Sequence, residues 1–235
     1  MPKTKQSIPR PTTVPDRNKH RAETAEPVDV PAPQPHRLWY WALLVAGTAM
    51  LAVCCAFAFH RTMPGWEQHL FRAINGRHLP AIYTQLAKQL SNAVWGLVAV
   101  VGVALLVPSL RWRAWQYAAA VGGAFVGEYV LEHLINRARP TILLHDTVLR
   151  AQQGGPGFPS GHETALAALT LTMWFYVAWP WRIVLGSLLL AEAWARIFLG
   201  VHAPLDVVGG LAVGMAVVGA LHLVPASWRK FFRLV

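Results

Sequence analysis

The stretch LWYWALLVAGTAMLAVCCAFAF, residues 38–59, contains no charged side chain. As a helix it is long enough to cross the hydrocarbon core of a bilayer, which takes about 20 residues. The chain as a whole is also apolar, because 54% of its 235 residues are hydrophobic and only 14% are charged. A typical soluble domain carries about 25% charged residues. The sequence therefore predicts an all-α integral membrane protein.

Five further apolar segments complete a predicted six-helix membrane bundle. They are residues 93–107, 115–135, 164–179, 183–199 and 205–224. Residues 61–92 are mixed in character, and their apolar residues recur at helical spacing. This segment is expected to form helices that lie in the membrane interface or pack outside the membrane.

The chain divides into a tail, residues 1–37, and a membrane domain, residues 38–235. The tail is polar and rich in proline and lacks hydrophobic periodicity, which predicts disorder. It is too long for the charged start of a signal peptide, so the first apolar run is expected to remain as an anchor. The adjacent Cys54 and Cys55 are the only cysteines, too few for a disulfide framework or a zinc site.

The basic residues predict how the protein is oriented in the membrane. With the N-terminus inside, most of the 21 lysines and arginines fall on the inner side, chiefly in the tail and at the C-terminus. The formal net charge of +10 is thus explained by topology, and no nucleic-acid partner is predicted. The expected location is a bacterial inner membrane, with both termini in the cytoplasm and the outer loops in the periplasm.

Three polar motifs meet on the outer side when the six spans alternate in direction. They are INRARP (135–140), FPSGHE (158–163) and ARIFLGVHAPLD (195–206). A helix start attracts anions, arginine forks match phosphate oxygens, and two histidines can divide the roles of nucleophile and general acid. Asp206 follows His202 by four residues and can hold its ring through Nδ1–H. Such a set suits phosphoryl transfer without a metal.

These motifs resemble those of the type 2 phosphatidic acid phosphatases, also called lipid phosphate phosphatases. The resemblance covers residues 93–224 and rests on Arg139-Pro140, PSGH (159–162) and the R-x5-H-x3-D pattern that ends at Asp206. It implies a phosphatase that needs no metal or other cofactor and acts on lipid phosphates or diphosphates.

The resemblance also implies a role for each residue. His202 attacks the phosphorus and becomes a phosphohistidine, Asp206 orients it, and His162 protonates the leaving oxygen. The implied phosphate-binding residues are Arg139, Arg196, Ser160 and Gly161.

Two positions depart from the family pattern. Glu132 stands where the first motif has lysine, and Ala195 replaces a frequent serine. A carboxylate near a phosphate costs about 4 kcal/mol per unit charge pair at an effective dielectric constant near 20. Glu132 is therefore expected to be neutralised, turned away or paired with Arg137 or Arg139. Arg137 is also a candidate for supplying part of the missing positive charge to the phosphate.

Other readings of the motifs remain open. Ser160 and Glu163 form S-x-x-E, a helix capping box, and Asp206 could simply cap the last span. Glu192 lies four residues before Arg196, where it either fixes that arginine for phosphate or forms a structural ion pair. Glu128 lies one turn before Glu132 and has no assigned role, whereas Gly210 and Gly214 predict close helix packing.

The sequence thus predicts a membrane phosphatase for a lipid such as undecaprenyl diphosphate, phosphatidylglycerol phosphate or phosphatidic acid. Because of Glu132, a protein that binds lipid phosphates without turnover is an alternative, and so is a phosphotransferase between lipids. A transporter is disfavoured because the polar motifs gather at one membrane face.

Overall fold

The computed structural model describes residues 37–60, 62–152 and 154–224, which belong to one helical unit. No strand occurs in this part of the chain, so the predicted all-α class is confirmed. The predicted disordered tail and the basic C-terminal residues lie outside the described residues.

The helices follow one another along the chain with short connections. They are α2 (Arg37–Ala58), α3 (Gly65–Asn75), α4 (Ala81–Leu106), α5 (Pro108–Ile135), α6 (Pro140–Leu143), α7 (Gly161–Trp174), α8 (Trp179–Phe198) and α9 (Pro204–Leu223).

Four segments of the described chain are long and apolar enough to cross a membrane. They are α2, α4, the stretch Ala114–Leu143 and α9. Large apolar side chains remain exposed on α2 and α4, including Val45 and Val100, as expected for surfaces that face lipid. α7 has only 14 residues, about 21 Å of helix, against about 30 Å of hydrocarbon. A helical membrane protein is thus confirmed, while the count of six spans stays a prediction.

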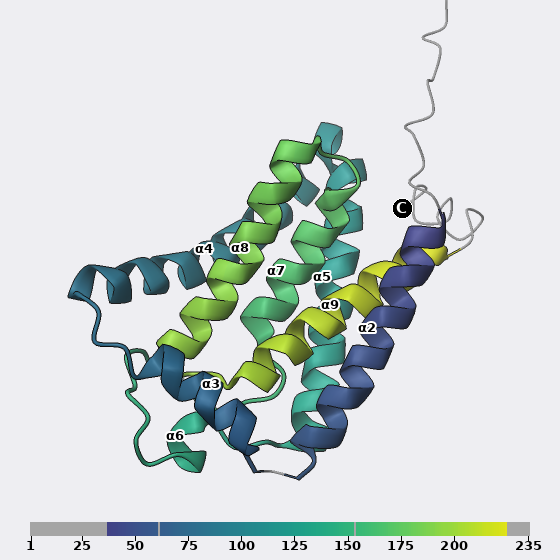
Figure 1. Ribbon diagram of the computed structural model, residues 1–235. Helices are drawn as coiled ribbons and strands as arrows, with labels where there is room; N and C mark the ends of the chain where they lie inside the picture. Colours follow the sequence, from purple (N-terminus) through teal and green to yellow (C-terminus); the bar gives the residue numbers. More distant parts are fainter. Residues whose placement is uncertain (1–36, 61, 153, 225–235) are drawn as a thin grey trace, which may run out of the picture. The chain divides into compact units, whose positions relative to one another are not determined.

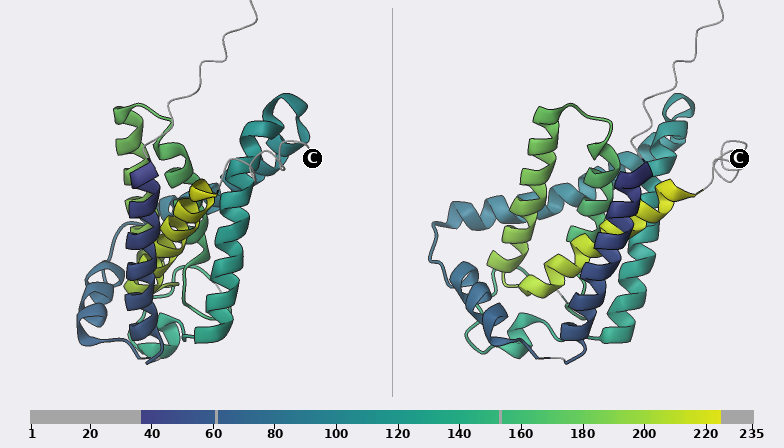
Figure 2. Two further views of the ribbon diagram at one scale, coloured as in Figure 1. Left: turned by 90° about the vertical axis from the view of Figure 1, so that its right-hand side faces the viewer. Right: turned by 45° about the vertical axis from the view of Figure 1, so that its right-hand side comes forward.

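The mixed segment 61–92 forms one short helix and the first half of a long one. α3 is a separate helix, but α4 continues through Gln85 and Lys88 into the predicted span 93–107 without a break. Residues 81–92 are therefore helical as predicted but continuous with the next predicted span, and their place in the membrane interface stays a prediction. α4 crosses behind α8 and α7 instead of running alongside them (Figures 1 and 2), and it contacts α5, α7 and α8.

α9 lies between α2 on one side and α7 and α5 on the other. Two glycines bring it close to α7, as predicted. A Cβ at Gly214 would lie 2.5 Å from Ala167 Cβ, and one at Gly210 would lie 2.6 Å from Ser160 O. Larger residues at these positions would force the two helices apart, and the start of α7 would move with them.

The three motifs meet at one end of the helices. Four helix ends lie together there, near α3 and α6 (Figures 1 and 2). They are the last turns of α5 and α8 and the first turns of α7 and α9. Asn75 of α3 holds this end in place, since its amide accepts from Val148 N and donates to Val148 O and Phe198 O. The connection between α6 and α7 is thereby fixed beside the end of α8.

Candidate active site

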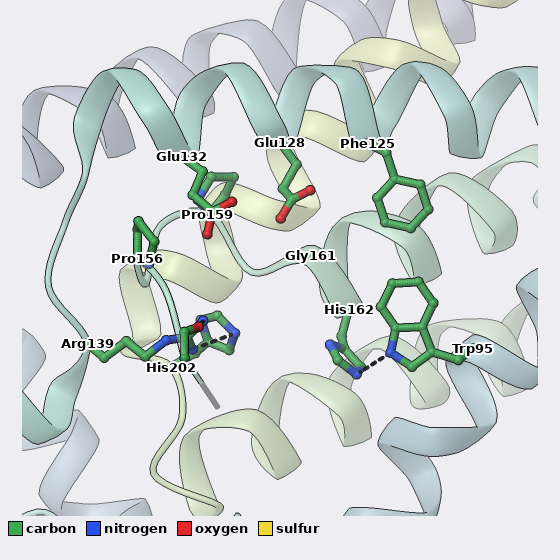
Figure 3. A pocket seen from close by; sticks show the side chains of 11 residues that line it. Trp95, Phe125, Glu128, Glu132, Arg139, Pro156, Pro159, Gly161, His162 and His202 are labelled. Carbon is green, nitrogen blue, oxygen red and sulfur yellow. Dashed lines mark hydrogen bonds between the residues drawn. The ribbon is translucent and has the colours of Figure 1, made fainter. Parts of the chain in front are cut away.

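A cavity of about 280 Å³ opens among the three motifs (Figure 3). Its lining residues are Trp95, Phe125, Glu128, Glu132, Arg139, Gly154, Pro156, Pro159, Gly161, His162 and His202. Of the residues expected to act on phosphate, the structure thus brings His162, His202, Arg139 and Gly161 to one cavity. Ser160, Arg196 and Asp206 are buried near it but do not line it.

The end of α5 sends two arginines in different directions. Asn136 adopts the left-handed conformation, with φ 45°, and its N–H closes the helix on Glu132 O. This is a common way for a helix to end. The next residues are not helical, so Arg137 and Arg139 do not share a face. Arg139 lines the cavity, whereas Arg137 turns into the protein interior.

Arg139 is held by backbone carbonyls on two sides of the cavity. Its Nε donates to Gly155 O at 2.9 Å, Nη2 to Gly154 O at 3.0 Å, and Nη1 to Val201 O at 2.7 Å. Nη1 also lies 3.4 Å from His202 Nε2. The guanidinium therefore joins the loop before α7 to the loop before α9, beside one of the two candidate catalytic imidazoles.

His202 is oriented with one ring nitrogen toward the cavity. Its Nδ1 lies 2.8 Å from Gly157 O, and a carbonyl oxygen only accepts, so Nδ1 carries the proton. Nε2 then keeps its lone pair beside Arg139. Burial lowers the pKa of His202 to about 4, and the charges of Arg196 and Arg139 act in the same direction, whereas Asp206 opposes them. The ring is therefore neutral and nucleophilic at neutral pH.

Asp206 does not make the predicted hydrogen bond to His202. Its Oδ2 lies 3.8 Å from His202 Nδ1, too far for a hydrogen bond, because Gly157 O occupies that position. Oδ2 instead accepts from Ala203 N at 2.8 Å at the start of α9, and Oδ1 accepts from Arg137 Nη1 at 2.8 Å. Asp206 thus caps the start of α9, which was the alternative role considered for it. It acts on His202 as a nearby negative charge.

Arg137 forms a buried ion-pair network and does not reach the cavity. Its guanidinium binds Asp206 and also Glu67 of α3, at 2.6 Å from Nη2 to Oε2. All three side chains are fully buried. Glu67 also accepts from Leu205 N at 2.9 Å. The expectation that Arg137 supplies positive charge to phosphate is therefore wrong, because two interior carboxylates already neutralise it.

Glu67 has a role that sequence reasoning missed. It is the residue through which α3 holds the start of α9, and hence the loop that carries His202. The available signal was a single acidic residue among apolar ones in the helical pattern of residues 65–75. Nothing in the sequence paired it with Arg137, which lies 70 positions away.

His162 points its two ring nitrogens in different directions. The indole Nε1–H of Trp95, on α4, donates to His162 Nε2 at 2.8 Å (Figure 3). Because an indole can only donate, this Nε2 carries no proton and the resting imidazole is neutral. Trp95 also stacks on Phe125, with ring centroids 5.6 Å apart. Sequence reasoning missed Trp95, which resembles any apolar residue of a span.

The capping box is not formed by its serine. Ser160 makes no side-chain bond to the start of α7, and its buried hydroxyl has no hydrogen-bond partner among the described residues. Glu192 is fully buried and accepts from Ser91 Oγ of α4 at 3.0 Å. It thus links α8 to α4 one turn before the buried Arg196.

Two carboxylates of α5 form the wall opposite Arg139 and His202. Glu132 and Glu128 both line the cavity, and Figure 3 shows them pointing from α5 toward the segment that carries Pro159. No hydrogen bond or ion pair joins either carboxylate to another described residue, so the expected pairing of Glu132 with an arginine is not found. A Cβ at Gly161 would lie 2.9 Å from Glu128 Oε1. Glu128 thus reaches the start of α7, the position predicted for phosphate.

The model of the PAP2 superfamily matches residues 113–230, half of the chain, and these residues include all three motifs. The chain belongs to this superfamily.

Two curated relatives share part of its length. The chain is 31% identical over 126 residues to a putative undecaprenyl-diphosphatase, YbjG, of Escherichia coli (strain K12), covering 52% of this chain and 57% of that protein. It is 35% identical over 133 residues to the decaprenylphosphoryl-5-phosphoribose phosphatase of Mycobacterium tuberculosis, covering 54% of this chain and 68% of that protein.

Two crystal structures share the fold. LpxE of Aquifex aeolicus superposes with a TM-score of 0.59 at 23% identity, over 66% of this chain and 93% of its own. A transmembrane PAP2-type phosphatidylglycerolphosphate phosphatase from Bacillus subtilis superposes with a TM-score of 0.58 at 17% identity, over 81% and 96%. At these identities the likeness concerns the fold alone.

Proposed function

We propose that this protein is a membrane phosphatase that releases phosphate from a lipid phosphate or diphosphate through a phosphohistidine at His202. The observation that carries the proposal is the cavity onto which His162 and His202 both open, with the unprotonated Nε2 of His202 beside Arg139. Membership of the PAP2 superfamily supports it, as do the relatives named as phosphatases.

The reaction has two steps. His202 Nε2 attacks the phosphorus, a P–N bond forms, and the bond to the lipid oxygen breaks as protonated His162 gives that oxygen a proton. Neutral His162 then takes a proton from water, the water oxygen attacks the phosphorus, and the P–N bond breaks to release phosphate. The hydrogen bond from Trp95 opposes a proton on His162 Nε2, so the first step requires that the phosphate dianion favour the imidazolium and release this bond.

Phosphate binding is proposed for Arg139, Arg196, Ser160 and the N–H of Gly161 at the start of α7. The start of a helix favours an anion. Arg139 must exchange a carbonyl partner for phosphate oxygen, and Glu128 must move away from Gly161. Asp206 is proposed to act through its charge and through the end of α9.

The proposed substrates are lipids that carry a terminal phosphate or diphosphate. The names of the relatives favour polyprenyl carriers such as undecaprenyl diphosphate, and phosphatidylglycerol phosphate and phosphatidic acid remain candidates. The distribution of basic residues supports a bacterial inner membrane, cytoplasmic termini and a cavity that opens on the periplasmic side. The reaction is proposed to need no metal.

The direct test is phosphate release by the purified full chain in detergent over these lipids, with and without a chelator. His202→Ala is expected to abolish release, a loss of about 10³-fold or more. His133→Ala is the matched control, because that histidine is exposed on α5 and outside the cavity. Full activity in His202→Ala would overturn the nucleophile, and loss on chelation would overturn metal independence.

Glu128 and Glu132 favour one alternative, which is binding of a lipid phosphate without turnover. Release from no lipid, together with stabilisation of the protein by one of them, would support this alternative. Transfer of labelled phosphate to a second lipid instead of water would identify a phosphotransferase.

A further inference from the structure

The two walls of the cavity carry opposite chemical character. Arg139, His162 and His202 face it from the loops and from α7, while Glu128 and Glu132 face it from α5 (Figure 3). The first set suits a phosphate. The second set, when ionised, repels one, because no described residue neutralises these partly buried carboxylates through an ion pair.

The position of the carboxylates is built into the helix. Residues four apart lie on the same face, so Glu128 and Glu132 point to the same side of α5. Like charges at this spacing destabilise a helix, and no ion pair with a described residue offsets the cost. These two acidic side chains line the same cavity as Arg139 and both histidines. They are therefore placed to bind the part of a ligand that lies next to its phosphate.

Aromatic side chains complete this wall. Trp95 and Phe125 line the cavity beside Glu128 and stack on each other at an interplanar angle of 5°. Carboxylates favour cations through direct charge, and aromatic faces favour them through their negative quadrupole. A hydroxyl group could donate a hydrogen bond to Glu132, but it carries no charge to offset the repulsion between carboxylate and phosphate. An ammonium group offsets that repulsion, and it interacts favourably with both the carboxylates and the aromatic faces.

We infer that the site selects lipid phosphates whose headgroup carries an ammonium group close to the phosphate, with Glu128 and Glu132 as the residues that bind it. This inference rests on the proposed phosphatase function and narrows its substrate class. The cation of the substrate takes the place of the lysine that the first motif lacks here, so a phosphate that brings its own ammonium group is accepted in preference to one that does not.

Three matched lipids test the inference with the full chain in detergent. The probes are a long-chain base 1-phosphate with a free amine two carbons from the phosphate oxygen, its N-acetyl derivative, and the analogue with a hydroxyl in place of the amine. The amine lipid is expected to show a kcat/KM about tenfold or more above both others. Equal values, or a preference for the hydroxyl lipid, would overturn the ammonium assignment while leaving the phosphatase intact.

Variants assign the effect to the two residues. Glu132→Gln and Glu128→Gln are each expected to reduce the amine-to-acetamide ratio, and Glu132→Lys to invert it. Turnover of the acetamide lipid shows that each variant is folded. Asp146→Asn is the control, since this exposed carboxylate pairs with Arg72 outside the cavity, and the ratio is expected to stay unchanged. An unchanged ratio in Glu132→Lys would contradict the inference.

Binding separates this inference from the proposed function. If neither the three probes nor the lipids of the direct test release phosphate, the phosphatase proposal fails. The inference then depends on whether the amine lipid raises the Tm of the protein more than the acetamide lipid does. Stabilisation that requires the amine and is lost in Glu132→Gln supports the ammonium site, and equal or absent stabilisation overturns it.

Discussion

Two groups of acidic residues lie at the same end of the described helices, and they differ in whether an arginine neutralises them. Glu67 and Asp206 share Arg137 in a fully buried network, whereas Glu128 and Glu132 line the cavity without an ion-pair partner in the described chain. The neutralised group joins α3, α5 and α9 and fixes the loop that carries His202. The uncompensated group faces the space where a ligand enters. The difference separates acidic residues that hold the site from those that meet a substrate.

The largest expected effect comes from breaking the neutralised group. Arg137→Met leaves Glu67 and Asp206 buried without their cation, which costs about 3–5 kcal/mol when one partner of a buried pair is removed. The Tm in detergent should fall steeply. A matched arginine, Arg77, is exposed, and among the described residues its guanidinium bonds only Ala73 O, so Arg77→Met should leave the Tm unchanged. A stable Arg137→Met protein would show that the network does not hold the fold.

The pH dependence of activity sharpens the comparison at His202, which lies between the two groups. Its lowered pKa of about 4 keeps Nε2 unprotonated through the neutral range, so protonation of His202 reduces activity only as pH falls through about 4. An unperturbed histidine would give an acidic limb near pH 6.5. The measurement is kcat/KM against pH with a substrate of known phosphate pKa. An acidic limb near 6.5 that does not follow the phosphate pKa of the substrate would mean that His202 is not buried as the structure has it.

Removing the donor of Trp95 should have an intermediate effect. In Trp95→Phe no indole N–H opposes a proton on His162 Nε2, so the alkaline limb of kcat/KM should move up by about half to one pH unit. The charged and titratable groups that also act on this ring are Arg196, His202 and Arg139. Trp194→Phe is the control, because Trp194 packs on Phe198 outside the cavity. If kcat/KM fell equally at every pH and its alkaline limb did not move, Trp95 would act through packing alone.

The smallest expected effect concerns stability at the cavity wall. Glu132→Gln removes repulsion from Glu128 and breaks no described ion pair, so the free energy of unfolding should rise by about 0.2–0.5 kcal/mol. The Tm of the ligand-free protein measures this. A clear loss of stability would show that Glu132 has a structural partner, and the contrast with Glu67 would then disappear.

Much of the arrangement could be predicted from the sequence because it depends on local patterns and their order. Apolar runs predict helices, and their alternation places INRARP, FPSGHE and the segment around His202 at one end. Gly214 predicts close packing because only a residue without a side chain fits there.

The remaining features depend on contacts between distant residues. Arg137 and Arg139 are two positions apart in a segment that is not helical, so no periodicity reveals which one faces the cavity. The sequence pattern favours Asp206 as the partner of His202, because the actual acceptor is the backbone carbonyl of Gly157, a group that every residue type carries. The extent of α4 was missed because Gln85 and Lys88 interrupt the apolar pattern without interrupting the helix.

The central claim is that His202 and His162 act on one phosphate in a single cavity. It is tested most directly by quenching the full chain during turnover of a lipid labelled in its phosphate and mapping the label. The account predicts acid-labile label on the peptide that contains His202, and no label on the protein in His202→Ala. Label on His162, or steady release of phosphate with no label on the protein, would contradict it.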